Sequence, residues 1–227
     1  MADLTIGVSM DLVTPVATIE KETLKAIRDH LNNKMPRSIE KIQRELGKNL
    51  VEVFRKTNEY KALIDGPLDA HFGIPPGEMQ IRLDQILETL SKQVRVKFKK
   101  ISIRGGVRLT GGIVISAFYS DFEELLDIGA ATVTTHKGQR LPWLEWLMIR
   151  GDEIIIADYK IKFGSGQKGS RSGGAVMIED TSSAWRVPPG ASGTQRNNWI
   201  TRGVEDSIKE IEKIITNIVE QVFDRIL

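Results

Sequence analysis

The first residues whose types and spacing could support chemistry form a glycine-rich segment. Residues 164–169, Gly-Ser-Gly-Gln-Lys-Gly, have the G-x-G-x-x-G spacing with which a backbone approaches the pyrophosphate of a dinucleotide. That motif needs a helix directly after the glycines, whereas residues 175–178 are an apolar, strand-like run. We therefore predict that residues 164–174 form a flexible hairpin loop that becomes ordered against a partner. A nucleotide-binding module that holds phosphate with Lys168 or Arg171 is the alternative.

The titratable residues give no pattern of catalysis or metal binding. His30, His71 and His136 lack a second ligand at a spacing such as H-E-x-x-H. The chain has no cysteine, which excludes thiol nucleophiles, zinc–thiolate sites and disulfides. We predict no catalytic residue, no cofactor and no metal ion.

A basic segment covers residues 92–108, which contain seven lysines or arginines and no acid. Arg95, Lys97 and Lys99 are the candidates for contact with phosphates of DNA or with an acidic neighbouring subunit. Base stacking is poorly supported, because the segment has one aromatic residue, Phe98. A solvated sheet face, or an edge strand protected by lysines, explains the same pattern.

The tryptophans and their neighbours are the candidates for a protein–protein interface. Residues 140–152, RLPWLEWLMIRGD, predict a helix of about three turns that is apolar nearly all round, and such a helix is covered on more than one side. An ordinary core helix of a monomer is equally compatible with it. Tryptophan and arginine are enriched at interface hot spots. The candidates are Trp143, Trp146, Gly166, Lys168, Arg171, Trp185, Arg186, Trp199 and Arg202.

Composition places the chain among ordinary globular proteins. It has 227 residues, 41% of them hydrophobic, and a net charge of +2, so bulk charge does not argue for nucleic acid. The N-terminus does not have the form of a signal peptide, and no apolar run is long enough to span a bilayer. The cytoplasm is the default location, and no membrane contact is predicted.

The periodicities predict an α+β fold in three regions. Residues 1–18 form an extended arm, residues 19–93 a helical region, and residues 94–227 an antiparallel sheet with the Trp-rich helix and a long C-terminal helix, in one compact unit with residues 19–93. Met35-Pro36 interrupts the first helix. Residues 59–77 are turn-rich.

Individual elements follow from local patterns. We predict a helix over residues 78–93 with Ile81 inward, a strand from residue 94 with a β-bulge at Lys100, and a hairpin turning at residues 157–158. Short strands are expected at 108–119, 132–135, 175–178 and 185–187, a short helix capped by Asp121 at 120–128, and a single terminal helix from Val204 to Ile226.

The closing part of the chain resembles a known group of proteins. Residues 198–206, NWITRGVED, lead into the terminal helix, and they follow RLPWLEWL (140–147), SRSGGAVM (170–177) and WRVPP (185–189). Over roughly residues 35–227 this order resembles the tail-completion and head–tail connector (neck) proteins of tailed bacteriophages. The usual T-G-x-L-R-x-S step is only echoed by residues 110–113, TGGI.

The resemblance implies a structural virion protein without catalysis, assembled in the host bacterial cytoplasm. Members of the group form homo-oligomeric rings, hexameric or dodecameric, that join portal and adaptor to the tail and let DNA pass without reading its sequence. The implied partners are further copies of the chain and other neck, portal-adaptor or tail proteins. The resemblance does not distinguish adaptor, stopper and terminator.

Overall fold

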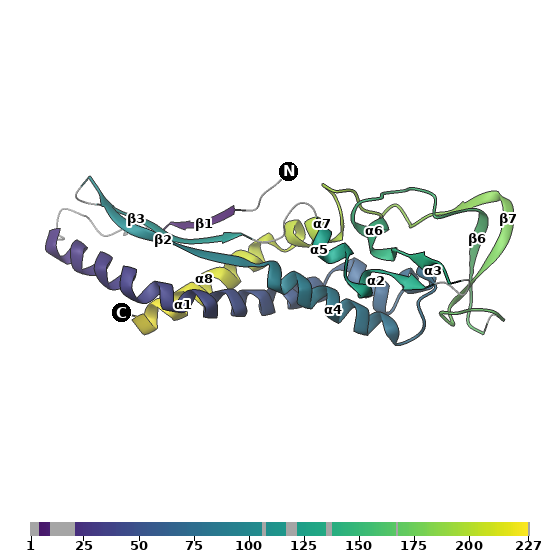
Figure 1. Cartoon of the computed structure of the whole chain (residues 1–227), viewed down its shortest axis with the longest axis horizontal. Coiled ribbons are helices and arrows are strands. Elements are labelled where there is room, and N and C mark those ends of the chain that lie inside the picture. The colour runs from purple at the N-terminus through teal and green to yellow at the C-terminus, as the bar shows by residue number, and fades with distance from the viewer. Residues whose placement is uncertain are drawn as a thin grey trace. The chain divides into compact units, whose positions relative to one another are not determined.

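The computed structural model describes residues 5–9, 21–105, 108–116, 122–134, 138–166 and 168–226 (Figure 1). Helices and antiparallel strands confirm the predicted α+β class. The chain divides into two compact units: unit 1 is built from residues 50–90 and 119–208, and unit 2 from residues 3–49, 91–118 and 209–227. Each unit takes residues from both the predicted helical region and the predicted sheet region.

Unit 2 contains an antiparallel sheet in which β3 (Arg108–Ser116) lies between β1 (Thr5–Ser9) and β2 (Arg95–Arg104). Part of the predicted extended arm is therefore a paired strand, and the remainder of residues 1–18 lies outside the described residues. The predicted bulge is confirmed by a register shift between Lys99 and Ser102. Gly111 faces this bulge with φ +124°, and a Cβ there would lie 2.6 Å from the carbonyl oxygen of Lys100. Only glycine fits this position.

The first helix of unit 2 continues through the proline that was expected to break it. Helix α1 spans Lys21–Arg55 with Pro36 inside, so the predicted interruption is wrong. Pro36 is exposed and lacks only the N–H that would bond the carbonyl of Asn32. Leu31 and Met35 before the proline and Ile42 after it are all buried. Burial on both sides outweighs a helix penalty of about 3 kcal/mol.

Asn32 also fixes α1 to the sheet. Its side-chain amide donates to the carbonyl of Ile101 at 2.9 Å, and its oxygen accepts from the Ile101 N–H at 2.8 Å. These two bonds satisfy the backbone of the bulge, which the strand ladder leaves unpaired. Further along α1, a Cβ at Gly47 would lie 2.8 Å from the carbonyl oxygen of Ser91, so this glycine allows close packing of α1 against Ser91.

The C-terminal region forms two helices, α7 (Trp199–Asp206) and α8 (Ile208–Ile226), so the prediction of one helix from Val204 is wrong. Ser207 separates them: its N–H turns back to the carbonyls of Val204 and Glu205 and does not continue the α-helical ladder. The predicted apolar spacing of α8 holds, and its buried residues include Ile211, Ile215, Ile218 and Val222.

The turn-rich region of unit 1 forms two short helices that the sequence did not predict, α2 (Asn58–Ile64) and α3 (Leu68–Phe72). Thr57 caps the first by accepting from the Tyr60 N–H, and Gly73 ends the second at φ +60°.

Helix α4 has the predicted bounds, Glu78–Gln93, but Ile81 does not point inward. Its side chain is 61% exposed. The buried stripe runs along Met79, Leu83, Ile86, Leu87 and Leu90, and at about 100° per residue Ile81 lies on the opposite side of the helix.

The Trp-rich segment of unit 1 is a shorter helix than predicted. Arg140–Leu141 form β5, which pairs with β4 (Val133–Thr134), and helix α6 covers only Trp143–Met148. Pro142 precedes the helix, and Gly151 at φ +62° turns the chain after it. Before these elements lie α5 (Glu123–Leu126), shorter than expected, and a 3₁₀ turn (Gly129–Ala131); the expected cap, Asp121, lies outside the described residues.

A long hairpin completes unit 1, with partners different from those predicted. Strand β6 (Ile156–Phe163) pairs with β7 (Ala175–Trp185), and residues 164–174 connect them (Figure 1). The predicted turn at residues 157–158 is wrong, because Asp158 at φ +61° is a bulge inside β6. The expected short strands at 175–178 and 185–187 are likewise wrong as separate elements, since β7 runs continuously to Trp185.

Candidate interaction surfaces

The four tryptophans lie in the core of unit 1. Trp143 and Trp199 have no exposed surface, and Trp146 and Trp185 keep 5% and 4%. The Trp199 indole N–H donates to Thr57 Oγ1 at 2.8 Å, and that of Trp143 donates to the carbonyl of Ala130 at 2.8 Å. In this conformation they hold the fold together and leave little surface for a partner.

Arg202 and Arg186, the arginines expected beside Trp199 and Trp185, differ in their surroundings. Arg202 donates from Nε to Glu59 Oε1 at 2.7 Å and from Nη1 to Asn197 Oδ1 at 2.9 Å, so it ties α7 to α2 and to the preceding loop. Arg186 lies 3.8 Å from an exposed Asp152 carboxylate and is itself half exposed. Arg202 is therefore structural, whereas Arg186 is open to solvent.

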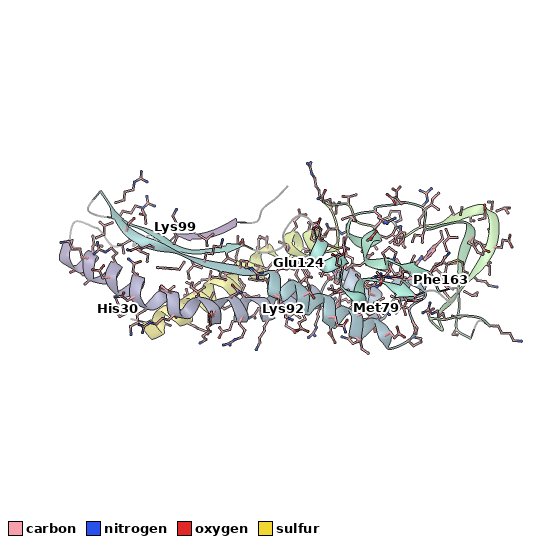
Figure 2. The ribbon with its side chains drawn as sticks, in the orientation of Figure 1. His30, Met79, Lys92, Lys99, Glu124 and Phe163 are labelled. Carbon is pink, nitrogen blue, oxygen red and sulfur yellow. The ribbon has the colours of Figure 1, made fainter. Side chains whose placement is uncertain are left out.

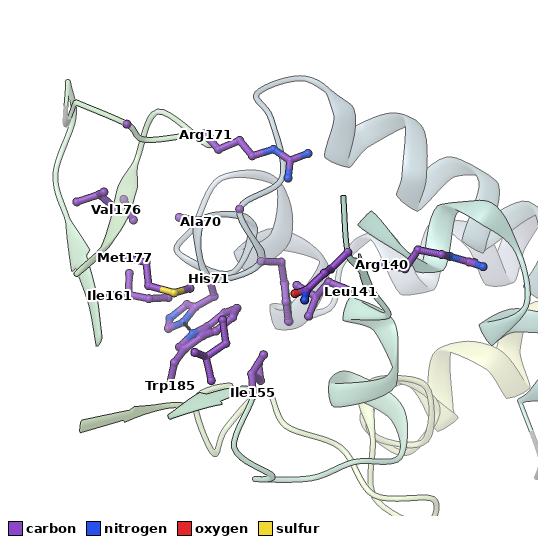
Figure 3. A pocket seen from close by; sticks show the side chains of 16 residues that line it. Ala70, His71, Arg140, Leu141, Ile155, Ile161, Arg171, Val176, Met177 and Trp185 are labelled. Carbon is purple, nitrogen blue, oxygen red and sulfur yellow. Dashed lines mark hydrogen bonds between the residues drawn. The ribbon is translucent and has the colours of Figure 1, made fainter. Parts of the chain in front are cut away.

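A pocket of about 350 Å³ lies between the β6–β7 hairpin and α3 (Figure 3). Its lining is mostly apolar and includes Leu141, Ile155, Ile161, Met177 and Trp185. With the α3 residues, the lining comes from four separate stretches of the chain, so no local spacing in the sequence could have revealed the pocket.

His71 forms one wall of this pocket. The Trp185 indole N–H donates to His71 Nδ1 at 3.1 Å, and the Phe163 ring meets the imidazole edge-on at 5.2 Å between ring centres. Burial lowers the pKa of His71, which keeps the ring neutral and Nδ1 free to accept. This contact attaches the hairpin to α3.

The charged residues that line the pocket are basic. Arg171 comes from the glycine-rich loop and Arg140 from β5 (Figure 3). Among the described residues, neither guanidinium has a carboxylate partner. Gly166 and Lys168 lie on the same loop, where Lys168 is exposed and Gly166 has φ +71°.

The loop is built as a strand connection. The Gly164 N–H donates to the carbonyl of Gly174 at 2.9 Å, so the segment closes the end of the hairpin, and β7 follows it. The glycines therefore do not precede a helix N-terminus, which the dinucleotide motif requires.

Large apolar side chains are exposed on and just before the hairpin. Ile154 and Phe163 are each 49% exposed, and Ile156 and Met177 are 37% and 36% exposed. Ile156 and Met177 also line the pocket, so apolar surface extends from the pocket onto the hairpin, as at surfaces that bind other proteins.

The basic strand presents its cations on one face of the unit 2 sheet. Arg95, Lys97 and Lys99 pair in register with Ser116, Val114 and Gly112, so the three cations share a face. The neighbouring Val96 and Ile101 are buried on the other. Lys97 and Lys99 are exposed (Figure 2 labels Lys99), and neither has a carboxylate partner among the described residues. Arg95 donates to the carbonyls of Lys92 and Val94, next to the end of α4.

Two further searches concern only the part of the chain that the structure describes. It contains no group of three or more histidine, aspartate or glutamate side chains placed to hold a metal ion. Each of its helices is too short or too polar to cross a membrane.

Comparison with known proteins adds no identification. No family model, no curated protein and no solved structure matches the chain.

Proposed function

We propose that this chain is a non-catalytic structural subunit of an oligomeric ring at the head–tail interface of a tailed bacteriophage. It would be assembled in the host cytoplasm and carried in the virion. The observation that carries the proposal is the β6–β7 hairpin, on which Phe163 and Met177 expose apolar surface beside a pocket. The contact between Trp185 and His71 attaches this hairpin to α3, and the apolar side chains that it still exposes are best explained by a partner that covers them.

A ring subunit needs two different surfaces, because each copy contacts one neighbour with each side. The hairpin surface of unit 1, which exposes Phe163 and Met177, can supply one of these surfaces, and the basic face of unit 2, with Arg95, Lys97 and Lys99, is available to DNA or to an acidic partner. The pattern-level resemblance of residues 35–227 to neck proteins supports the same function.

The basic face favours a second candidate function, sequence-independent binding of nucleic acid. Alternate strand residues are about 6.8 Å apart, so Lys97 and Lys99 form a regular row of cations without carboxylate partners among the described residues. Such a row neutralises phosphates without reading bases. In a ring it would face passing DNA or an acidic neighbour; alone, it would make the chain a nucleic-acid-binding module.

The ring proposal is tested by imaging the purified protein alone and mixed with phage portal-adaptor and tail proteins. Six-fold or twelve-fold rings, or capping of heads or tails by the protein, are the expected results. A protein that stays monomeric in every mixture would contradict the proposal. DNA binding by such a monomer would support the nucleic-acid-binding module.

A further inference from the structure

Ile81 is an unexpected feature of the surface of unit 1. At 61% exposure it has the largest exposed fraction of the large apolar side chains that the structure describes. It lies on the outward side of α4, opposite the buried stripe of Met79, Leu83 and Ile86. An exposed isoleucine in the first turn of an ordered helix contributes little to the core, so its surroundings indicate what it could contact.

Those surroundings hold three carboxylates and two arginines, so they keep an excess of negative charge. Glu78, Asp84 and Glu88 are three positions before, three after and seven after Ile81, and all three are exposed on the same side of α4. Arg82 binds Glu78 at 3.1 Å and Arg55 binds Asp84 at 3.0 Å. Each of these two pairs uses one carboxylate oxygen, Oε2 of Glu78 and Oδ1 of Asp84, which leaves the second oxygen able to accept. We call Ile81 with these three acids the knob.

The pocket beneath the hairpin has the complementary character. Its floor and walls are apolar, with Ile161, Met177 and Leu141 among them. Of its charged lining residues, Arg171 is without a carboxylate partner among the described residues, whereas the Arg140 side chain points away from the apolar lining and donates to Thr132 Oγ1 at 3.5 Å (Figure 3). The pocket volume of about 350 Å³ exceeds that of one isoleucine side chain. The pocket thus has room for Ile81, and knob and pocket match in their apolar centre and in the sign of charge at the rim.

We propose that the knob of one copy of this chain inserts into the hairpin pocket of the next copy. Because the two surfaces are different, the contact is heterologous, and repetition of such a contact generates a ring when the rotation closes. This inference rests on the proposed function, and it names the residues that form one subunit–subunit contact. Ile81 fills the apolar floor, while Arg171 meets a carboxylate beside it.

Two single variants separate the two halves of the contact. Ile81→Gln removes the apolar centre of the knob and keeps a good helix former on an exposed position, so the fold is retained. Met177→Glu places a carboxylate in the pocket, where it repels the acids of the knob. Each change is expected to weaken self-association about 10-fold to 100-fold, as loss of one buried isoleucine implies. Arg171→Glu, on an exposed loop residue, tests the pocket without changing its apolar lining.

The matched control is Ile149→Gln, which changes another exposed isoleucine of unit 1, 39% exposed and outside the knob. Self-association of this variant should equal that of the wild type. Circular dichroism and melting curves of all variants establish that a lost contact is not a lost fold.

The decisive experiment mixes the two defective variants and titrates one into the other by sedimentation or fluorescence anisotropy. Ile81→Gln retains a pocket and Met177→Glu retains a knob, so together they can form one contact and no more. A saturable one-to-one complex, with neither variant binding itself, is the expected result. Undiminished self-association of Ile81→Gln, or no complex between the two variants, would overturn the inference.

Failure of this inference can be told apart from failure of the proposed function. If both variants still form the rings that the wild type forms, the ring function stands and the knob-and-pocket contact is refuted. A wild-type protein that remains monomeric alone but joins assemblies with phage tail proteins would lead to the same conclusion. Assembly lost in Met177→Glu but kept in Ile81→Gln would place a different segment in the pocket and would also overturn the assignment.

Discussion

Replacement of Gly193 by alanine should destabilise unit 1 strongly, because the backbone of the loop at residues 188–198 packs directly against α6. A Cβ at this position would lie 1.8 Å from the carbonyl oxygen of Leu147 and 2.8 Å from Cβ of Asn198. The first obstacle is backbone at the end of a helix, which cannot move aside as a flexible side chain can. The loop would have to withdraw from α6.

Withdrawal of this loop from α6 would lower the stability of unit 1 by breaking two backbone hydrogen bonds of Gly193. The Gly193 N–H donates to the carbonyl of Trp146 at 2.8 Å, and its own carbonyl accepts from the Gly151 N–H at 2.7 Å. Two such bonds contribute about 0.5–1.5 kcal/mol each, and overpacking of a filled site costs about 1–3 kcal/mol. We expect a loss of about 4 kcal/mol in the free energy of unfolding of unit 1, or a fall of about 8–16 °C in its melting temperature.

Tryptophan fluorescence during urea and thermal unfolding is the suitable assay, since all four tryptophans belong to unit 1. Gly190→Ala is the matched control in the same loop: a Cβ at Gly190 meets no atom within 4 Å. It should change stability by less than about 0.5 kcal/mol. Equal effects of the two substitutions would refute the packing of this loop on α6.

Three further predictions concern other parts of the molecule. Burial lowers the pKa of His71, so as the pH falls the unfolded chain takes up a proton near pH 6.5 before the folded chain does. The stability of unit 1 should therefore fall as the pH drops below about 6.5. Melting curves from pH 7.5 to 5.5 should show this fall, and His71→Gln should flatten it. Lys97→Ala with Lys99→Ala should weaken binding to double-stranded DNA and reduce the slope of log affinity against log salt by about 2, and an unchanged slope would argue against phosphate contacts. Gly111→Ala should destabilise unit 2 by more than about 1 kcal/mol, because φ is +124° and the Lys100 carbonyl blocks the added methyl group. Hydrogen exchange of the amides in β2 and β3 is the readout, and unaltered protection would contradict the bulge geometry.

Patterns that depend on neighbouring residues were predictable from the sequence. The bounds of α4 follow from its apolar period, and the bulge in β2 follows from the slip between Phe98 and Ile101. Elements that depend on distant partners were not. Local sequence predicts a helix break at Pro36, because it gives no information about the packing on either side of the proline. Likewise, Ala157-Asp158 reads as a turn because a bulge with positive φ uses the same residue types.

The candidate surfaces divide in the same way. The basic face was predictable, because alternation along one strand places Lys97 and Lys99 on one side. The pocket was not, because its walls come from α3, β5, β6 and β7. Ile81 was predicted to point inward because it is apolar, although its angular position on the helix is opposite the stripe that Leu83 and Ile86 define.

Ring formation is tested by the native mass of the wild-type chain across a concentration series, alone and with phage tail proteins. A ring subunit is expected to give discrete assemblies of six or twelve copies, formed by the chain itself or completed when a tail component is added. A single 25.4 kDa species under every condition would contradict it.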